Sequence, residues 1–368
     1  MQRRDFVRKA TLGAAAGVTL AGCGGGAPGE GGAPAVQTQR TIRWRLVSSF
    51  SRSLDTIYGA AEVLAERVSA LTDGRFQIRP YPGGELVPAF GVLDAVQSGT
   101  VQMGHTASYY YVGKNPAFAF DTCVPFGLTS RQQTAWMYHG GGLELMRALF
   151  ADFGIRPFPG GNTGAQMGGW FRREVPSLSD LRGIKMRIPG LGGRVMDALG
   201  VTPQQISSSE IYPALERGAI DATEWVGPYD DEKLGFNQIA RFYYYPGWWE
   251  PGPQLTFYVN QREWDRLPAA YQEALTVAAA EAHVGMQAKY DAQNPPALQR
   301  LVDAGTELRR FANDILTAAA EQTTAILEEQ AADPTYNRIY TAFKDWKQRS
   351  FRWFGLAEQA YAHFAFGT

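Results

Sequence analysis

The sequence has few of the residues that commonly carry catalysis or cross-links, with two cysteines and four histidines among 368 residues. The cysteines, Cys23 and Cys123, allow at most one disulfide. The histidines are scattered, and the chain has no Walker loop, GxSxG, HExxH or CxxC motif. These absences remove the usual sequence evidence for a nucleotide-binding protein, a serine hydrolase or a zinc enzyme.

An excess of positive charge is also missing, because 35 basic residues are balanced by 36 acidic residues. Residues 1–22 hold four basic residues and one acidic residue, so their removal would change the net charge from −1 to about −4. A chain of this charge has no electrostatic footprint for nucleic acid and no polybasic patch for a membrane surface. We therefore expect no nucleic-acid partner.

An apolar run near the N-terminus predicts export. Arg3 and Arg4 precede an apolar segment at 10–21, which has the length of a signal-peptide core and is too short to span a bilayer. The twin arginine followed by Phe6 is typical of a Tat signal, although Lys9 lies one position later than usual. Residues 1–22 are thus predicted to be a signal peptide, and the mature protein is predicted to be periplasmic.

The end of this segment, Leu-Ala-Gly-Cys at 20–23, resembles a lipobox. Such a box would make Cys23 the acylated N-terminus, and the lipid anchor would be the only membrane contact. An ordinary secretory peptide cut near Ala21 is the alternative. Residues 23–38 are rich in Gly, Pro and Ala and are expected to form a flexible tether. With Cys23 acylated, Cys123 is left alone and is predicted to be a small buried side chain.

The part of the chain after residue 38 is long for one domain, so two lobes are expected. Hydrophobic periodicity predicts the alternating strands and helices of an α/β fold with largely parallel sheets. The predicted strands are 41–47, 75–81, 101–104, 185–188, 219–224 and 258–261, and the predicted helices are 54–71, 90–98, 193–199, 209–217, 264–290, 313–332 and 336–354. Ligands of such sheets bind at the carboxyl ends of the strands.

The last predicted helix carries a stripe of large side chains at Ile339, Phe343, Trp346 and Trp353. Packing on its own subunit is one interpretation. A contact with a second copy is the other, because so many aromatic residues near a terminus are hard to bury on one subunit.

Four segments carry a specific resemblance to a known family: 72–86, 99–103, 180–190 and 210–225, the last reading E-x-x-x-A-L-x-x-G-x-I-D-A-T-E-W. They resemble the DctP-type solute-binding proteins of TRAP (tripartite ATP-independent periplasmic) transporters. Residues 161–170 and 245–253 are similar to the TakP-like branch of that family, which binds 2-oxo acids.

The resemblance implies a two-lobe fold like that of periplasmic binding proteins, with a long connecting helix and extra C-terminal helices. We expect lobe I at 39–160, lobe II at 161–252, a return to lobe I and the connecting helix at 253–295, and a C-terminal helical region at 296–368. The implied function is a receptor, not an enzyme, that captures a small 2-oxo or 2-hydroxy monocarboxylate with Na⁺ or Ca²⁺ and delivers it to the membrane permease. The resemblance also implies a homodimer through the C-terminal helices.

A carboxylate enclosed between two lobes needs charge-assisted hydrogen bonds, and a guanidinium offers two parallel donors of matching geometry. By its match to the family, Arg187 is the expected carboxylate clamp. The alternative is an exposed strand arginine that pairs with an acidic side chain. The candidate ligand-contact residues are Arg187, Gln166, Tyr109, Tyr110, Asn162 and Trp225.

A hard cation takes oxygen ligands. The candidate ligands are the Gln166 amide, the Glu224 carboxylate, the Trp225 backbone carbonyl and, as a second carboxylate, Glu250. Two carboxylates beside one arginine would repel an incoming anion unless a cation lay between them. Each acid has an alternative reading as a surface or helix-end charge.

The apolar walls are expected to come from aromatic residues. Tyr109 and Tyr110 follow the predicted strand 101–104 at its carboxyl end, where phenols can pack against a ligand and donate a hydrogen bond. The sequence does not separate them from Tyr111, and core packing is the alternative for all of them. Asn162 is flanked by glycine, which is equally typical of a turn residue.

Two other functions remain open at this point. A periplasmic metal-dependent enzyme acting on a 2-oxo acid is one, because a chelated cation can polarise a carbonyl; the absence of a histidine beside the expected site argues against it. A structural lipoprotein that uses its aromatic C-terminal helix is the other. A cavity lined by Arg187 and Glu224 would argue against the second.

Overall fold

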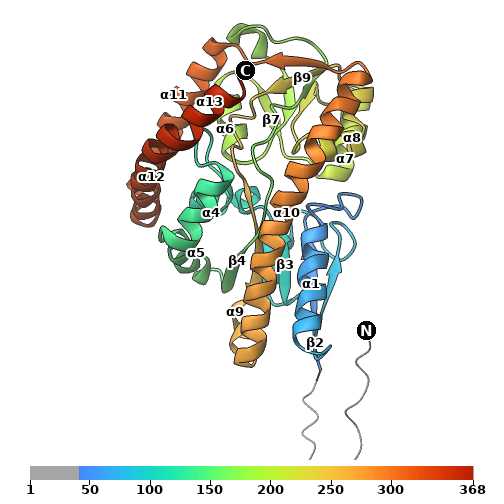
Figure 1. The fold of residues 1–368 in the computed structure, drawn as a ribbon, viewed down its shortest axis with the longest axis vertical. Helices are drawn as coiled ribbons and strands as arrows, with labels where there is room; N and C mark the ends of the chain where they lie inside the picture. Colours follow the sequence, from blue (N-terminus) through green and yellow to red (C-terminus); the bar gives the residue numbers. More distant parts are fainter. Residues whose placement is uncertain (1–40, 368) are drawn as a thin grey trace, which may run out of the picture. The chain divides into compact units, whose positions relative to one another are not determined.

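The computed structural model describes residues 41–367, and these fold around two β-sheets (Figure 1). The predicted signal peptide at 1–22, the tether at 23–38 and the lipidation site Cys23 lie outside the described residues. The strand order is β2-β1-β3-β10-β4 in the first sheet and β11-β9-β5-β8-β6-β7 in the second. The α/β class predicted from the sequence is confirmed.

The first sheet begins with two β-α-β units, as predicted. Its strands are β1 (Ile42–Ser48), β2 (Phe76–Tyr81), β3 (Met103–Thr106), β4 (Ile155–Asn162) and β10 (Gln254–Asn260), and its connecting helices are α1 (Gly59–Leu71) and α2 (Val92–Gln97). β1 is parallel to β2 and β3, whereas β10 is antiparallel to β3 and β4. α1 buries a face that includes Ala61, Leu64 and Val68. α2 approaches β3 closely at Gly104, where a Cβ would lie 2.4 Å from Val92 Cγ1.

The second sheet places the predicted arginine strand beside the strand that precedes Glu224. Its strands are β5 (Trp170–Phe171), β6 (Lys185–Arg187), β7 (Thr202–Gln204), β8 (Ala222–Thr223), β9 (Phe242–Tyr245) and β11 (Glu307–Arg310), and its helices include α6 (Gly190–Ala198), α7 (Ser208–Glu216) and α8 (Pro228–Leu234). β6 is parallel to β7 and β8, and Arg187 stands opposite Thr223 in the register. Arg187 and Glu224 therefore meet at the carboxyl edge of the sheet.

One long helix, α10 (Ala269–Asp303), runs beside both sheets (Figure 1). It packs against α1 and β4 of the first sheet and against α8 of the second. The short helix α9 (Gln261–Asp265) precedes it, whereas the sequence predicts a single helix at 264–290. α10 continues past Pro295 and Pro296 because Ala297 and Leu301 beyond them are buried. This packing outweighs the roughly 3 kcal/mol that a proline costs inside a helix.

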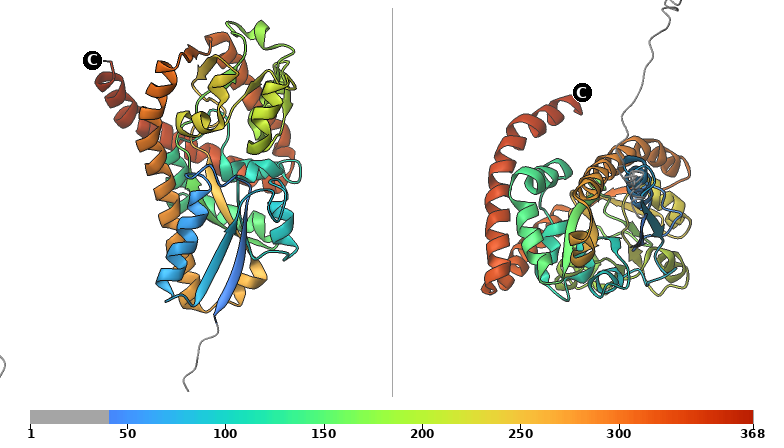
Figure 2. Two further views of the ribbon diagram at one scale, coloured as in Figure 1. Left: turned by 90° about the vertical axis from the view of Figure 1, so that its right-hand side faces the viewer. Right: turned by 90° about the horizontal axis from the view of Figure 1, so that it is seen from below.

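The C-terminal helices divide the predicted aromatic stripe into a buried part and an exposed part. They are α11 (Asn313–Glu329), α12 (Pro334–Phe354) and α13 (Ala360–Ala365), with a π-helical turn at Gly355–Gln359. α12 packs on α3 (Ala119–Thr122), α4 (Ser130–His139) and α5 (Gly142–Ala151). Ile339 and Phe343 are buried there, Trp346 is half-buried and Trp353 is 64% exposed. α13 leads away from the helices on which α12 packs (Figure 2).

The remaining regular elements are single 3-10 turns. They lie at Ser108–Tyr111, Pro116–Phe118, Leu178–Leu181, Phe236–Gln238 and Gln330–Ala332. None of the helices at 41–367 has both the length and the apolar character needed to cross a membrane.

The sequence patterns do not predict β4, β5, β7, β9 or β11. β4 contains Pro157 and Pro159, which are typical of a loop, but β4 forms the edge of its sheet, where a missing N–H is tolerated. β11 lies in a region expected to be helical, and it pairs with β9 in parallel. β11 reads ELRR, and its single apolar residue, Leu308, gives no alternation that the sequence could reveal.

Candidate functional site

The buried ion pair of Arg187 and Glu224 is the centre of the candidate site. Their side chains are 1% and 0% exposed. Arg187 donates from Nη1 to the Glu224 carboxylate and to the Glu224 backbone oxygen (3.1 Å), and from Nε to the Ile206 oxygen (3.1 Å). Only Nη2 then remains for another acceptor. This differs from the two-donor clamp expected from the sequence, because Glu224 and Ile206 occupy the other donors.

Backbone hydrogen bonds join the loops that carry the candidate cation ligands. Gln166 donates its N–H to the Glu250 carbonyl (3.1 Å), and its own carbonyl accepts from Gly247 (3.0 Å). Met167 donates to the Val226 carbonyl (3.2 Å). The three loops therefore form one unit beside the second sheet, with their relative positions set by the backbone and not by the ligand-binding side chains.

Several buried polar atoms in this unit lack partners. Gln166 Oε1, Glu224 Oε2 and Glu250 Oε2 accept no hydrogen bond within residues 41–367, and Arg187 Nη2 donates none there. Buried polar atoms are normally satisfied. The three oxygens suit a hard cation, which prefers carboxylate and amide oxygens, and the guanidinium nitrogen suits an anion. The residues present therefore fit a cation and a carboxylate bound side by side.

The donor set does not suit a zinc-type site. No group of three His, Cys, Asp or Glu residues that could hold a metal occurs in the described part of the chain. A cation here would depend on the amide oxygen of Gln166 and the backbone carbonyl of Trp225 as well as on two carboxylates. Oxygen donors of this kind are typical ligands of hard cations such as Ca²⁺.

Burial dominates the ionisation of both acids. It raises the pKa of Glu224 well above its usual range, although the Arg187 charge lowers it, and the Glu250 charge raises it further. Burial also raises the pKa of Glu250 to about 7, with Arg187 again opposing the shift. Arg187 alone therefore does not supply enough positive charge to keep both carboxyl groups ionised, and a proton on one of them is favoured. A second positive charge would allow both to be ionised.

The first sheet supplies the opposite wall of the site. Tyr109 and Tyr110 lie in the turn after β3, with their ring centroids 5.0 Å apart. They line one cavity together with Gln166, Arg187 and Trp225. Burial raises the pKa of both tyrosines, so their hydroxyls stay protonated and can donate hydrogen bonds.

The cavity is small in this closed arrangement. Its volume is about 10 Å³, which is room for roughly one water molecule. Its other lining residues are Phe50, Ile57, Thr122, Thr163, Val226, Pro253 and Leu255. An organic acid can enter only if the two walls move apart, since the cavity as it stands is smaller than any such ligand.

Asn162 is placed differently from the expectation. Its Nδ2 donates to the Gly252 carbonyl (3.0 Å), and its Oδ1 accepts from the Gly164 N–H (2.9 Å). It is not among the residues that line the cavity. In this structure the Asn162 side chain holds the turn that leads into the Gln166 loop. Its expected contact with the acid stays a prediction, as do the roles of Glu224 and Glu250, which are also absent from the cavity lining.

The structure also separates the neighbouring tyrosines. The Tyr111 hydroxyl lies 3.1 Å from Thr106 Oγ1 in the core, which leaves Tyr109 and Tyr110 at the cavity. Cys123 is buried, and burial raises the pKa of its thiol well above the usual range. A thiol with this pKa is a poor nucleophile, in agreement with the predicted small buried side chain.

Sequence reasoning missed several lining residues. Phe50 follows β1 at its carboxyl end, so the rule that selected Tyr109 would also have selected Phe50. Thr122 and Thr163 carry no comparable signal, because isolated threonines in short helices and loops are common. Their positions follow from the packing of α3 and from the course of the chain after β4.

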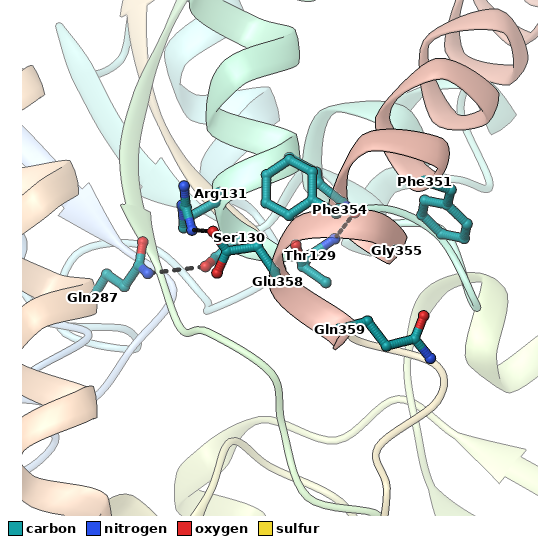
Figure 3. Close-up of a pocket in the computed structure, with 10 residues that line it drawn as sticks. Thr129, Ser130, Arg131, Gln287, Phe351, Phe354, Gly355, Glu358 and Gln359 are labelled. Carbon is teal, nitrogen blue, oxygen red and sulfur yellow. Dashed lines mark hydrogen bonds and ion pairs between the residues drawn. The ribbon is translucent and has the colours of Figure 1, made fainter. Parts of the chain in front are cut away.

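A larger cavity of about 430 Å³ lies between the start of α4, α10 and the π-helical turn before α13 (Figure 3). Arg131 pairs there with Glu358 (2.7 Å) and lies 5.2 Å from the Phe354 ring centroid, and Gln287 donates to Ser130 (2.9 Å). These polar side chains pair with one another, and the cavity shares no lining residue with the smaller one. The smaller cavity, beside which charged groups lack partners in the described residues, is therefore the candidate ligand site.

The fold and the site together define a class of protein: an α/β chain with two sheets and, between them, a small cavity beside buried charged and polar groups that lack partners in the described residues. The chain belongs to the family of bacterial extracellular solute-binding proteins, family 7 (DctP), whose model matches residues 47–333. The predicted family is thereby confirmed.

Two kinds of relative agree with this assignment. The monocarboxylate 2-oxoacid-binding periplasmic protein of Nostoc sp. is 54% identical over 325 residues, which cover 88% of this chain and 89% of the relative. Among solved structures, one match is a TRAP transporter solute-binding protein from Bordetella bronchiseptica, with calcium and picolinate in its site. Its TM-score is 0.88 at 47% identity, and the match covers 89% of this chain and 98% of that protein. A second, from Pseudoalteromonas atlantica with bound sodium and pyruvate, has a TM-score of 0.85 at 42% identity over 88% of this chain and 98% of its own.

Proposed function

We propose that this chain is the substrate-binding receptor of a TRAP transporter and that it captures a small 2-oxo or 2-hydroxy monocarboxylate together with Na⁺ or Ca²⁺. One observation carries the proposal: beside the buried Arg187–Glu224 pair, one donor suits a carboxylate and three oxygens suit a cation. The relatives named above, which bind 2-oxoacids, pyruvate or picolinate, support the same class of solute.

The residues have distinct roles in this proposal. Those that would hold the cation are Gln166, Glu224, Trp225 and Glu250. A bound cation supplies the positive charge that two buried carboxylates and an organic anion require in a closed site. Arg187 orients the acid by donating from Nη2, and the protonated hydroxyls of Tyr109 and Tyr110 close the cavity from the first sheet. Closure buries the acid between the two walls, and delivery to the permease requires it to reopen.

The alternative of a 2-oxo acid enzyme receives no support from the site. The family comprises solute-binding proteins. The buried histidines His105 and His283 lie outside the cavity lining, and burial lowers their pKa values to about 3 and about 4. The structural-lipoprotein alternative does not account for the unpaired charged groups around Arg187.

The proposed location is the periplasm, where this family of proteins acts. Export through the signal peptide at 1–22 and anchoring through acylated Cys23 would keep the receptor beside the permease. Both depend on the sequence motifs alone, so mass spectrometry of the mature N-terminus is their direct test.

We also infer a homodimer formed through the C-terminal helices. Leu356, Phe364 and Phe366 are 75%, 74% and 86% exposed, which is costly for adjacent apolar side chains in water. The cavity of Figure 3 lies at the base of this segment, between Phe351 and Phe354 of α12 and Thr129, which precedes α4. An apolar segment from a second copy would cover both surfaces.

The proposed function is tested by thermal-shift screening of the purified protein, freed of bound ligand, with pyruvate, lactate, longer 2-oxo acids, sugars and amino acids. Each solute is added with Ca²⁺, with Na⁺, and with neither cation. Stabilisation by 2-oxo or 2-hydroxy acids in the presence of a cation supports the proposal. Stabilisation by sugars or amino acids alone contradicts it.

A further inference from the structure

Asp231, on α8, accepts hydrogen bonds from three directions behind the candidate cation site. Its Oδ2 accepts from Trp170 Nε1 (3.0 Å) and from the Tyr243 hydroxyl (2.7 Å), and its Oδ1 accepts from the backbone N–H of Val226 (3.3 Å). The side chain of Asp231 is fully buried. Trp170 and Tyr243 stack with ring centroids 4.0 Å apart, so the groups that hold the carboxylate are themselves fixed.

The Val226 N–H belongs to the same peptide plane as the Trp225 carbonyl. In a trans peptide the N–H and C=O point in opposite directions, so a bond that holds the N–H also sets the direction of the oxygen. The next peptide is held as well, because the Val226 carbonyl accepts from the Met167 N–H (3.2 Å). Trp225 thus presents its carbonyl away from Asp231, between two fixed peptides.

We propose that Asp231 is a positioning residue of the cation site and that it acts by orienting the Trp225 carbonyl. The inference rests on the proposed function, because it concerns the same cation. Partners that orient metal ligands typically change metal affinity 10- to 100-fold when removed, although they do not touch the metal. Of the three residues at 41–367 that donate to the Asp231 side chain, only Val226 lines the cavity.

Asp230 provides a matched control. It is the neighbouring residue, its side chain is equally buried, and its Oδ2 accepts from the Tyr290 hydroxyl (2.6 Å). No bond links Asp230 to the backbone of the 224–226 segment in the described residues. Asp230 faces the Trp225 side chain, and the amide oxygen of Asp230→Asn can keep that contact. Asp230→Asn therefore removes a buried acid at the next position but leaves the bond from the Val226 N–H to Asp231 in place.

The experiment compares wild type, Asp231→Asn and Asp230→Asn with Ca²⁺ and with Tb³⁺ as a luminescent probe of the same site. In Asp231→Asn we expect the amide oxygen at the Oδ2 position, where it keeps the bonds from Trp170 and Tyr243. The amide N–H then faces the Val226 N–H, so the Val226 peptide is no longer held and can rotate. We expect Ca²⁺ affinity to fall about 10-fold or more and the Tb³⁺ lifetimes in H₂O and D₂O to report about one additional bound water, which replaces the lost carbonyl. Asp230→Asn is expected to match wild type in both.

The outcomes separate the two proposals. If wild type binds neither ion and Na⁺ does not tighten pyruvate binding either, the proposed function fails. If wild type binds and Asp231→Asn shows unchanged affinity and hydration, the positioning role is overturned and the proposed function stands. Should Asp231→Asn not fold, Tyr243→Phe keeps the ring stack but removes one bond to Asp231; a smaller loss of affinity with increased Tb³⁺ hydration supports the role, and wild-type values for both contradict it.

Discussion

Arg187 and Glu224 form an ion pair whose side chains are almost completely removed from water, at 1% and 0% exposure. Burying two charges costs several kcal/mol each, and their attraction repays this only when the remaining polar atoms are satisfied. Here Arg187 Nη2 and Glu224 Oε2 have no partner in the described chain. The pair is therefore better suited to receiving an anion and a cation than to stabilising the empty protein.

The first prediction concerns Arg187. Arg187→Lys keeps the charge but loses the planar group that reaches Ile206, Glu224 and a ligand at the same time. We expect acid affinity to fall at least about 10-fold by calorimetry, since one charge-assisted hydrogen bond is worth about 1.5–3 kcal/mol. The control is Arg194→Lys, at a half-buried arginine whose pair with Glu329 lies outside the cavity lining. An affinity equal to wild type would show that Arg187 does not touch the acid.

The second prediction concerns the stability of the pair. Arg187→Met leaves Glu224 buried without its partner and should lower the free energy of unfolding by about 3–5 kcal/mol. Adding Glu224→Gln removes the stranded carboxylate and should restore part of this loss. Urea unfolding of the two single variants and the double variant measures the coupling. Additive effects would mean that the two residues do not interact.

The third prediction is a pH dependence. Asp121 is buried, accepts from Thr256 (2.7 Å), and burial raises its pKa from 3.8 to about 6. Because the folded-state pKa is the higher one, the native state binds this proton more tightly. The contribution to stability is therefore complete below about pH 4 and is lost as the pH rises through 6, amounting to roughly 3 kcal/mol.

Asp121→Asn should flatten this dependence between pH 4.5 and pH 7.5 in urea unfolding without added cation. The exposed variant Asp152→Asn should retain the wild-type slope. Since Asp230 and Asp231 are also buried with raised pKa values of about 6 and about 7, part of the slope should remain. A slope unchanged by Asp121→Asn would exclude this residue as a source.

The fourth prediction concerns contacts that join the two sides of the cavity. Asp55, before α1, bonds Lys289 of α10 (3.0 Å), the Tyr229 hydroxyl (3.2 Å) and Lys233 of α8, and the two lysines lower its pKa although burial opposes them. Asp55→Asn should release bound acid about two- to fivefold faster in stopped-flow experiments, the range for partly exposed ion pairs.

High salt should reduce this difference, because screening weakens the wild-type contact. Arg67→Gln breaks a different exposed pair, with Glu281 (2.7 Å), which joins only α1 and α10, and should leave the release rate unchanged. Equal rates for wild type and Asp55→Asn would show that these contacts do not hold the closed arrangement.

The fifth prediction tests the dimer. Leu356→Asp together with Phe364→Asp places charges on the exposed apolar segment and should convert a dimer into a monomer in sedimentation experiments. Acid affinity should stay at the wild-type value, because neither residue lines the ligand cavity. A wild-type protein that is monomeric at micromolar concentration would contradict the inferred dimer.

The sequence predicts the α/β fold and much of the candidate site because both depend on local patterns. Regular alternation marks β1 to β3, and the carboxyl-end rule selects Tyr109 and Tyr110. The meeting of Arg187 and Glu224 follows from the register of two short parallel strands. Periodicity predicts these strands but not the roles of Arg187 and Glu224 in the site, which come from their match to a family motif.

Long-range packing explains what the sequence does not predict. β4 contains prolines, which indicate a loop and are tolerated in this strand because it forms the edge of the sheet. β11 is recognisable as a strand only through its pairing with β9. Asn162 holds a turn because Gly252, distant in sequence, lies beside it. In the sequence, Asp231 is indistinguishable from other acidic residues in the first turn of a helix. Its bond from the Val226 N–H depends on the position of α8 relative to the 224–226 segment.

The central claim is that Arg187 and an oxygen-bound cation together neutralise the organic acid. Calorimetric titration of ligand-free wild type with pyruvate, first in buffer without Na⁺ or Ca²⁺ and then at saturating Ca²⁺, tests it most directly. We expect weak or undetectable binding without the cation and tight binding with it, and by linkage pyruvate must tighten Ca²⁺ binding by the same factor. Equal pyruvate affinity in the two buffers, with no gain from saturating Na⁺ either, would contradict the account.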